Sequence, residues 1–173
     1  MILAVDIGNT NVTCGVYDGE KWVHILRLPS TLNFWNQFST LKEFDITECA
    51  ISSVVPNLIQ VYIESIRNLF QIDAHIITCQ NSGVELLVET PQDVGIDRIC
   101  NVAAAKLLVG TPAIVGDIGS ATNYDVVDEN GAFIGGAIAP GIKVAAHNLI
   151  EKAALLNETV FTVPEFAVGK NTK

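Results

Sequence analysis

Apolar and polar positions alternate in short runs along the first half of the chain. Runs that are rich in apolar and β-branched residues and bounded by Gly, Pro or Asn predict strands at residues 2–5, 12–17, 21–28, 48–55 and 74–78. Apolar side chains recur at helical spacing in residues 34–44 and again in residues 58–69, behind the break at Pro56-Asn57. Three strands followed by alternating helices and strands predict a mixed sheet covered by helices.

The second half of the chain begins the same pattern again. We expect strands at residues 113–115, 124–127 and 132–139 and a helix at residues 142–156, after a linking helix that Gly110 ends. The sequence therefore predicts an α/β protein of two lobes, the first at residues 1–110 including the linking helix and the second at residues 111–173. The second lobe lacks the helix-strand-helix tail of the first, so we interpret it as incomplete at the C-terminus, either minimal or shortened.

The tripeptide Asp-Ile-Gly ends the first strand of both lobes, as residues 6–8 and as residues 117–119. A short apolar run precedes each copy, and hydroxyl or amide side chains follow it, before a second strand and a Gly-containing turn. For one copy alone, an ordinary β-hairpin is the simpler interpretation. Two copies in matching contexts favour two related lobes that face one cleft.

Both loops carry side chains that suit phosphate and metal binding. Glycine lets the backbone approach a phosphate and turn its N–H groups toward it, and Asp6 and Asp117 can hold a hydrated cation. Neither loop has the Lys of a G-x-x-x-x-G-K-[ST] loop or the spacing of G-x-G-x-x-G. We therefore expect neither a Walker-type nor a Rossmann site.

Asp97 and Arg98 lie at the expected start of the linking helix, after a loop at residues 89–93. A carboxylate near a helix N-terminus is favoured by the helix dipole, which suits a base that accepts a proton from a hydroxyl in the transition state. Arg98 offers a planar fork for a carboxylate or a phosphate. The alternative is that Asp97 is a helix-start residue paired with its neighbour, and without the two Asp-Ile-Gly loops that interpretation is the preferred one.

Composition limits the class of protein and its partners. The net charge of −9 and the isoelectric point near 4.6 argue against a nucleic-acid surface, which needs a clustered basic face. No apolar run approaches the roughly 18 residues of a membrane span, and the N-terminus opens on a strand without a basic segment, so we expect a cytoplasmic protein that binds no membrane. The cysteines form no C-x-x-C pair, and we expect buried, reduced thiols at Cys14, Cys49, Cys79 and Cys100.

Four ordered segments resemble the signatures of the type III pantothenate kinases. They are residues 6–11 (Asp-Ile-Gly-Asn-Thr-Asn), 95–98 (Gly-Ile-Asp-Arg), 117–122 (Asp-Ile-Gly-Ser-Ala-Thr) and 135–141 (Gly-Gly-Ala-Ile-Ala-Pro-Gly). The resemblance covers nearly the whole chain. It implies the fold of the acetate and sugar kinase, Hsc70 and actin superfamily, which consists of two ribonuclease-H-like lobes.

The resemblance also implies a reaction, the ATP-dependent phosphorylation of pantothenate to 4'-phosphopantothenate at the first step of coenzyme A biosynthesis. Asp97 is then the general base, and the pantothenate-binding residues are Gly95, Ile96, Asp97, Arg98 and Thr172. The ATP-binding residues are Asp6, Ile7, Gly8, Asn9, Thr10, Asn11, Val12, Thr13 and Ser120. Asp6 organises the Mg²⁺ that comes with ATP, Asp117 binds a monovalent cation, K⁺ or NH₄⁺, and the family implies a homodimer.

Two other functions fit the same scaffold. A non-catalytic regulatory protein that binds nucleotide or pantothenate is motivated by Ser120 and Asn123, which differ from the family's usual loop, and by the short C-terminus. A phosphohydrolase of the same superfamily is the third interpretation, because the fold alone does not determine the acceptor. The regulatory protein would bind ligand without forming product, and the hydrolase would break down ATP whether or not pantothenate is present.

Overall fold

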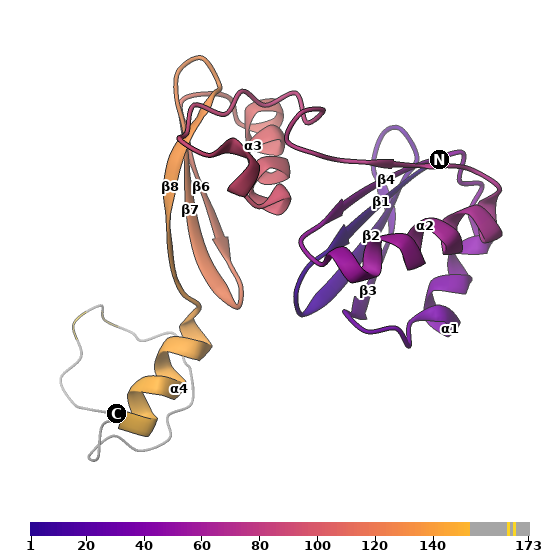
Figure 1. Ribbon diagram of the computed structural model, residues 1–173, viewed down its shortest axis with the longest axis horizontal. Coiled ribbons are helices and arrows are strands. Elements are labelled where there is room, and N and C mark those ends of the chain that lie inside the picture. Colours follow the sequence, from indigo (N-terminus) through magenta and orange to yellow (C-terminus); the bar gives the residue numbers. More distant parts are fainter. Residues whose placement is uncertain (153–165, 167, 169–173) are drawn as a thin grey trace. The chain divides into compact units, whose positions relative to one another are not determined.

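The computed structural model describes residues 1–152, 166 and 168. The chain forms two compact units, the first made of residues 1–115 and 125–136 and the second of residues 116–124 and residues from 137 onward. The elements (Figure 1) are β1 (Ile2–Ile7), β2 (Asn11–Tyr17), β3 (Trp22–Pro29), α1 (Trp35–Phe38), β4 (Glu48–Ser53), α2 (Pro56–Phe70), β5 (Ala74–Ile76), α3 (Ile96–Leu108), β6 (Ala113–Ile118), β7 (Ala121–Val127), β8 (Phe133–Pro140) and α4 (Ile142–Lys152).

Five strands of the first unit form one mixed sheet. Their order across the sheet is β3-β2-β1-β4-β5, with β2 antiparallel to β1 and to β3, and with β4 parallel to β1 and to β5. Parallel neighbours need a crossover connection, and α2 supplies it between β4 and β5. The sheet and its helices confirm the mixed α/β arrangement that the pattern of apolar runs predicts.

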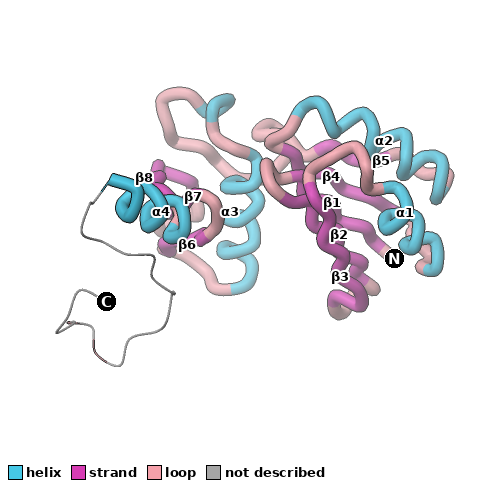
Figure 2. Tube along the Cα trace, turned by 90° about the horizontal axis from the view of Figure 1, so that it is seen from below, coloured by secondary structure: helices cyan, strands magenta, loops and turns pink. Residues whose placement is uncertain are grey.

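The short helix α1 and the longer α2 lie on the same side of this sheet (Figures 1 and 2). Phe34 stacks on Tyr62 of α2 with ring centroids 4.2 Å apart, and Phe38 meets Tyr62 edge-on at 5.3 Å. The rings belong to one apolar core with buried side chains of the sheet, among them Leu3, Val5, Ile7, Val12, Cys14, Val16 and Ile51. Because side chains alternate along a strand, the burial of Leu3, Val5 and Ile7 places Asp6 on the opposite face of the sheet.

A second sheet has the strand order β6-β7-β8. Ile99 and Val102 of α3 form a separate buried cluster with Val127 of β7 and Phe133 of β8. The apolar positions of α3 therefore follow the helical spacing expected for the linking helix. Each Asp-Ile-Gly tripeptide ends the first strand of a hairpin, β1–β2 and β6–β7, as predicted.

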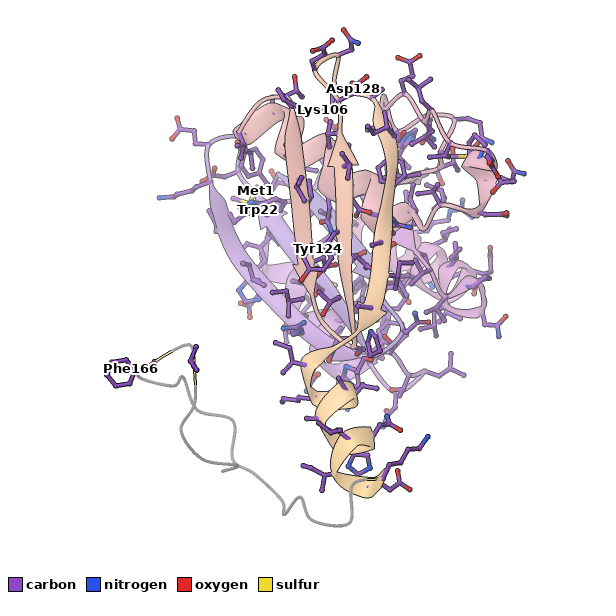
Figure 3. The ribbon with its side chains drawn as sticks, turned by 90° about the vertical axis from the view of Figure 1, so that its left-hand side faces the viewer. Met1, Trp22, Lys106, Tyr124, Asp128 and Phe166 are labelled. Atoms are coloured by element: carbon purple, nitrogen blue, oxygen red, sulfur yellow. The ribbon has the colours of Figure 1, made fainter. Side chains whose placement is uncertain are left out.

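The turn between β7 and β8 is held by one carboxylate. Asp128 Oδ1 accepts the N–H of Asn130 at 2.9 Å and the N–H of Ala132 at 2.8 Å. Gly131 in this turn has a φ of 82°, a conformation that favours glycine. The Lys106 side chain of α3 lies close to this turn (Figure 3): a Cβ added to Gly131 would lie only 2.6 Å from Lys106 Cε.

Two helices differ in extent from the ranges expected from the sequence. Residues 34–44 form α1 followed by a 3-10 helix (Ser39–Glu43), because the hydroxyls of Ser39 and Thr40 donate to carbonyls of the preceding turn, those of Asn36 and Gln37. The helix expected at residues 142–156 is α4, Ile142–Lys152, and the rest of that range lies outside the described residues. Among the helices that the structure describes, none is both long and apolar enough to cross a membrane.

Candidate functional site

The first Asp-Ile-Gly loop connects β1 to β2 and is held from two sides. The N–H of Gly8 donates to the carbonyl of Asn11 at 3.0 Å, which closes the turn. Ser30, directly after β3, donates its hydroxyl to the Gly8 carbonyl at 2.5 Å and its N–H to the Thr10 carbonyl at 3.1 Å. Three hydrogen bonds therefore hold the backbone of the expected phosphate loop, while Asn9 is exposed.

The carboxylate of Asp6 is oriented by the neighbouring strand. Ser52 of β4 donates its hydroxyl to Asp6 Oδ1 at 2.6 Å, and the two residues are partners in the register of the parallel pair β1/β4. Ser52 is only 8% exposed, so water competes little for this hydroxyl. A hydrogen bond to an ionised group is among the stronger contacts in a protein, and it restricts the rotamer of Asp6.

Asp97 lies in the first turn of α3, as predicted, and Gly95 is the N-cap residue of that helix. Asp97 Oδ1 accepts the backbone N–H of Arg98 at 2.8 Å. A Cβ added to Gly95 would lie 2.5 Å from this same oxygen. Because φ of Gly95 is −56°, which any residue adopts, glycine is required here for the space it leaves to the Asp97 carboxylate.

Cys100 of α3 lies near both the Asp6 and the Asp97 carboxylate. Burial raises the pKa of Cys100, the negative charge of Asp6 raises it further, a hydrogen bond with Ser52 lowers it, and the charge of Asp97 raises it slightly. Ser52 contacts Asp6 directly, and Cys100 lies near enough to Asp6 and Asp97 for both charges to raise its pKa. We call these four side chains the Asp6–Asp97 cluster. The cluster draws its side chains from β1, β4 and α3, and α3 packs against β4.

The expectation of four buried thiols holds for two of them. Cys14 and Cys49 are buried in the first core, and all four cysteines are reduced. For Cys79 and Cys100 the expectation of full burial is wrong, because both are partly exposed. Cys100 lies in the first turns of α3 and belongs to neither of the two apolar cores.

The guanidinium of Arg98 is paired inside the first unit. Its Nε and Nη2 donate to Oδ1 of Asp125 on β7, at 2.8 and 2.5 Å. The central carbon of the guanidinium lies 5.3 Å from the centre of the Phe133 ring. Asp97 contacts only the backbone N–H of Arg98, so the partner of the Arg98 side chain is Asp125 and not its neighbour in the sequence.

The second Asp-Ile-Gly loop connects β6 to β7 and belongs to the second unit. The N–H of Gly119 donates to the carbonyl of Ala121 at 2.8 Å, one residue sooner than in the first loop, so this turn is tighter. Gly141, which follows β8, donates its N–H to the Ser120 carbonyl at 3.0 Å. A Cβ added to Gly141 would overlap the Gly119 carbonyl oxygen and lie 2.6 Å from that of Ser120. The fourth signature segment thus ends directly against the third.

The expected site residues are divided between the two units. Asp6, the first loop and residues 95–98 belong to the first unit, Asp117 and Ser120 belong to the second, and Thr172 lies outside the described residues. Within the described part of the chain, no group of three or more His, Cys, Asp or Glu side chains could hold a metal ion. The Asp6 carboxylate, which Ser52 orients, suits a Mg²⁺ ion that arrives on nucleotide phosphates, since such an ion uses one or two protein carboxylates.

Comparison with known proteins decides the family. Residues 2–173 match the family described as type III pantothenate kinase. The chain belongs to the type III pantothenate kinase family. The type III pantothenate kinase of Agathobacter rectalis is 41% identical to it, over 99% of this chain and 71% of its own length. That of Thermomicrobium roseum is 38% identical, over 100% of this chain and 71% of its own length.

Solved structures show the fold of this type III pantothenate kinase family member. A Campylobacter jejuni protein named as a conserved Baf family transcriptional activator is 24% identical, with a TM-score of 0.55 over 98% of this chain and 69% of that one. A Ppx/GppA phosphatase of Aquifex aeolicus is 12% identical, with a TM-score of 0.51 over 87% of this chain and 56% of that one. These likenesses concern the fold alone, and they agree with the α/β fold expected from the sequence.

The sequence analysis does not single out three side chains of the site. They are Ser30, Ser52 and Asp125. Ser30 marks only the end of a strand in the sequence, and the other two lie inside predicted strands. A polar residue within a buried strand is the signal that could have found Ser52 and Asp125, because a buried polar side chain needs a partner.

Proposed function

We propose that the protein transfers the terminal phosphoryl group of ATP to the hydroxyl of pantothenate, which gives 4'-phosphopantothenate at the first step of coenzyme A biosynthesis. Membership of the type III pantothenate kinase family supports this reaction. The observation that carries it is the Asp6–Asp97 cluster: Ser52 of β4 orients Asp6, α3 packs against β4, and the charges of Asp6 and Asp97 both act on Cys100. Phosphoryl transfer depends mainly on positioning and charge neutralisation, which such a cluster can supply.

The start of α3 is the proposed acceptor site. Asp97 is the general base that takes the proton of the pantothenate hydroxyl as the new oxygen–phosphorus bond forms. Arg98 binds the carboxylate of pantothenate, and the other proposed contacts to pantothenate are Gly95, Ile96 and Thr172. The space that Gly95 leaves beside the Asp97 carboxylate supports this assignment, since a larger residue would displace the base.

The Asp-Ile-Gly loops are the proposed nucleotide sites. Residues 6–13 hold the ATP phosphates, Ser120 contacts ATP and Asp117 binds a monovalent cation, K⁺ or NH₄⁺. Mg²⁺ bound to ATP neutralises phosphate charge, and Asp6 is the residue proposed to organise it. The net charge of −9 supports a role for cations, because the loops carry no Lys or Arg that could neutralise a polyanion.

The proposal extends to the organisation of the protein. We expect a cytoplasmic homodimer, with lobes at residues 1–110 and 111–173, that binds neither nucleic acid nor membranes. The acidic composition supports the lack of a nucleic-acid partner, because such partners attract basic surfaces. Sedimentation equilibrium checks the oligomeric state, and a monomer at micromolar concentration would contradict the dimer.

Release of ADP from MgATP tests the function directly. The reaction is run with and without pantothenate, first in potassium buffer and then in buffer with sodium as the sole monovalent cation. We expect ADP release that requires both pantothenate and potassium. Binding of either ligand without ADP release would favour a regulatory protein, and release that is indifferent to pantothenate would favour a hydrolase.

The role of Asp97 is tested by Asp97→Asn. We expect turnover at saturating substrates to fall about 10²- to 10⁴-fold, the usual contribution of a general base. Asp93→Asn is the matched control, because Asp93 is exposed in the short 3-10 helix before Gly95 and should leave turnover unchanged. Undiminished turnover of Asp97→Asn would rule out the proposed base.

A further inference from the structure

Asp125 is a buried carboxylate to which the proposed reaction assigns no role. Its side chain is 0% exposed, and it lies in the middle of β7. Oδ1 is hydrogen-bonded to Arg98, whereas Oδ2 is buried and has no hydrogen-bond partner among the described residues. A buried carboxylate costs stability unless it is fully paired, so its presence calls for a reason other than stability.

Asp125 occupies one edge of the Arg98 guanidinium. Nε and Nη2 both donate to Asp125 Oδ1, and the Phe133 ring lies 5.3 Å from the central carbon. Within the described residues Nη1 donates no hydrogen bond, and the Arg98 side chain keeps 15% of its surface exposed. The guanidinium is therefore held in one orientation by a carboxylate and a ring, with Nη1 outside the pair.

Pairing also changes how Arg98 can recognise an anion. The charge of the guanidinium is largely compensated by the buried Asp125 carboxylate, so the pair attracts distant anions weakly. The paired guanidinium can still donate a hydrogen bond from Nη1, and the strength of such a bond depends on its orientation. The specificity of this arrangement thus comes from geometry more than from net charge.

We propose that Asp125 is a positioning residue that makes the site selective for a substrate with a carboxylate group. By holding the Nε and Nη2 edge, Asp125 keeps Arg98 from turning and leaves Nη1 as the donor to that carboxylate. The inference rests on the proposed function, because it takes pantothenate as the acceptor and Arg98 as the residue that binds its carboxylate. Asp125 itself touches no substrate atom in this account.

The chain contains a matched pair for a control. Nε and Nη2 of Arg67 both donate to Asp73 Oδ1, at 3.1 and 2.6 Å, which is the same arrangement of donors and acceptor. This pair is 61% and 83% exposed and joins the end of α2 to the residues before β5. Asp73→Asn therefore removes an equivalent carboxylate where exposed ion pairs contribute little.

The test compares Asp125→Asn with Asp73→Asn on two acceptors, pantothenate and pantothenol, in which an alcohol replaces the carboxylate. For Asp125→Asn we expect the KM for pantothenate to rise roughly 10- to 100-fold, as for loss of a charge-assisted contact, with little change in kcat. The kcat/KM for pantothenol should stay within about twofold of the wild-type value, since pantothenol has no carboxylate to position. Asp73→Asn should leave both acceptors unchanged.

Arg98→Lys gives a second test that does not require Asp125→Asn to fold. Lysine keeps the charge beside Asp125 but lacks the fixed fork, so the preference for pantothenate over pantothenol should fall by a similar factor. The double variant should be no worse than either single variant, because both act through one contact. If kcat/KM fell equally for pantothenate and pantothenol, or if the preference for pantothenate were unchanged, the inference about Asp125 would be overturned and the proposed function would stand. A wild-type protein that phosphorylates neither acceptor would overturn the proposed function and this inference with it.

Discussion

Ser52 donates its hydroxyl to Asp6 at 2.6 Å across the parallel pair β1/β4, although the two residues are 46 positions apart in the sequence. Ser52 also lies near Cys100 of α3, whose pKa it lowers. The orientation of the Asp6 carboxylate is therefore determined by β4, whereas the loop that follows Asp6 is held separately by Ser30. Changes at Ser52 should affect the carboxylate without disturbing the loop.

Ser52→Ala tests this relationship. Without the hydroxyl, Asp6 loses a charge-assisted hydrogen bond, and we expect kcat/KM for MgATP to fall roughly tenfold while that for pantothenate at saturating MgATP changes less. Steady-state kinetics with each substrate varied in turn measures both. Ser65→Ala is the control, because Ser65 is equally buried at 6% exposure but donates to the Val61 carbonyl within α2. An equal loss in both variants would show that a buried hydroxyl, and not Asp6, is what matters.

Gly95→Ala should lower activity with little cost in stability. The added Cβ would come within 2.5 Å of Asp97 Oδ1, and a carboxylate at the end of a side chain can move away where backbone cannot. We expect kcat to fall about 10- to 100-fold because the base is misplaced, with a melting temperature within a few degrees of the wild type. Circular dichroism and ADP release measure the two quantities. A variant that melts much earlier would indicate that Gly95 serves the helix start rather than the base.

Gly141→Ala, in contrast to Gly95→Ala, should lower the stability of the protein. Its Cβ would collide with the backbone carbonyls of Gly119 and Ser120, which cannot move without opening the tight second loop. We expect a loss of at least about 2 kcal/mol in the free energy of unfolding. Gly116→Ala is the control, because a Cβ at Gly116 meets nothing within 4 Å. Equal stabilities of the two variants in urea titrations would contradict the close approach at Gly141.

Stability should fall at alkaline pH because of two core thiols. Burial raises the pKa of Cys14 to about 12, with smaller contributions from Cys49 and Asp6, and burial raises the pKa of Cys49 to about 12. An unfolded thiol loses its proton near pH 8.5, so above that pH the unfolded chain binds fewer protons than the folded one. The contribution to stability is full below about pH 8.5 and is lost as the pH rises toward about 12.

Urea midpoints at pH 7.5 and pH 10 measure this dependence. Cys14→Ala removes one of the two thiols, so its midpoint should fall less between the two pH values than that of the wild type. Cys79→Ala is the control, because Cys79 lies outside the first core and is only partly buried. Parallel pH profiles of the wild type and Cys14→Ala would contradict the buried-thiol explanation.

Local patterns in the sequence predict most of the elements. Alternation and β-branched content locate β1 to β4. The break at Pro56-Asn57 locates α2, which begins at Pro56 itself, and the helix start expected at Asp97 and Arg98 falls in the first turn of α3. These predictions succeed because strand alternation, helical spacing and the backbone preferences of Gly and Pro act over a few residues. The division of residues 34–44 into α1 and a 3-10 helix was missed, because hydroxyl-to-carbonyl contacts compete there with the regular helix.

The sequence by itself determined the two Asp-Ile-Gly hairpins, the Asp97-Arg98 helix start and the membership of a kinase family. Only the tertiary structure decided which distant side chains meet these residues: Ser52 with Asp6, Asp125 with Arg98, and Gly141 with the second loop. The physical reason is that an apolar pattern specifies which face of a strand or helix is buried. The register between strands, and the packing of α3 against them, then decide which polar residue lies opposite another, and those depend on contacts across the whole chain.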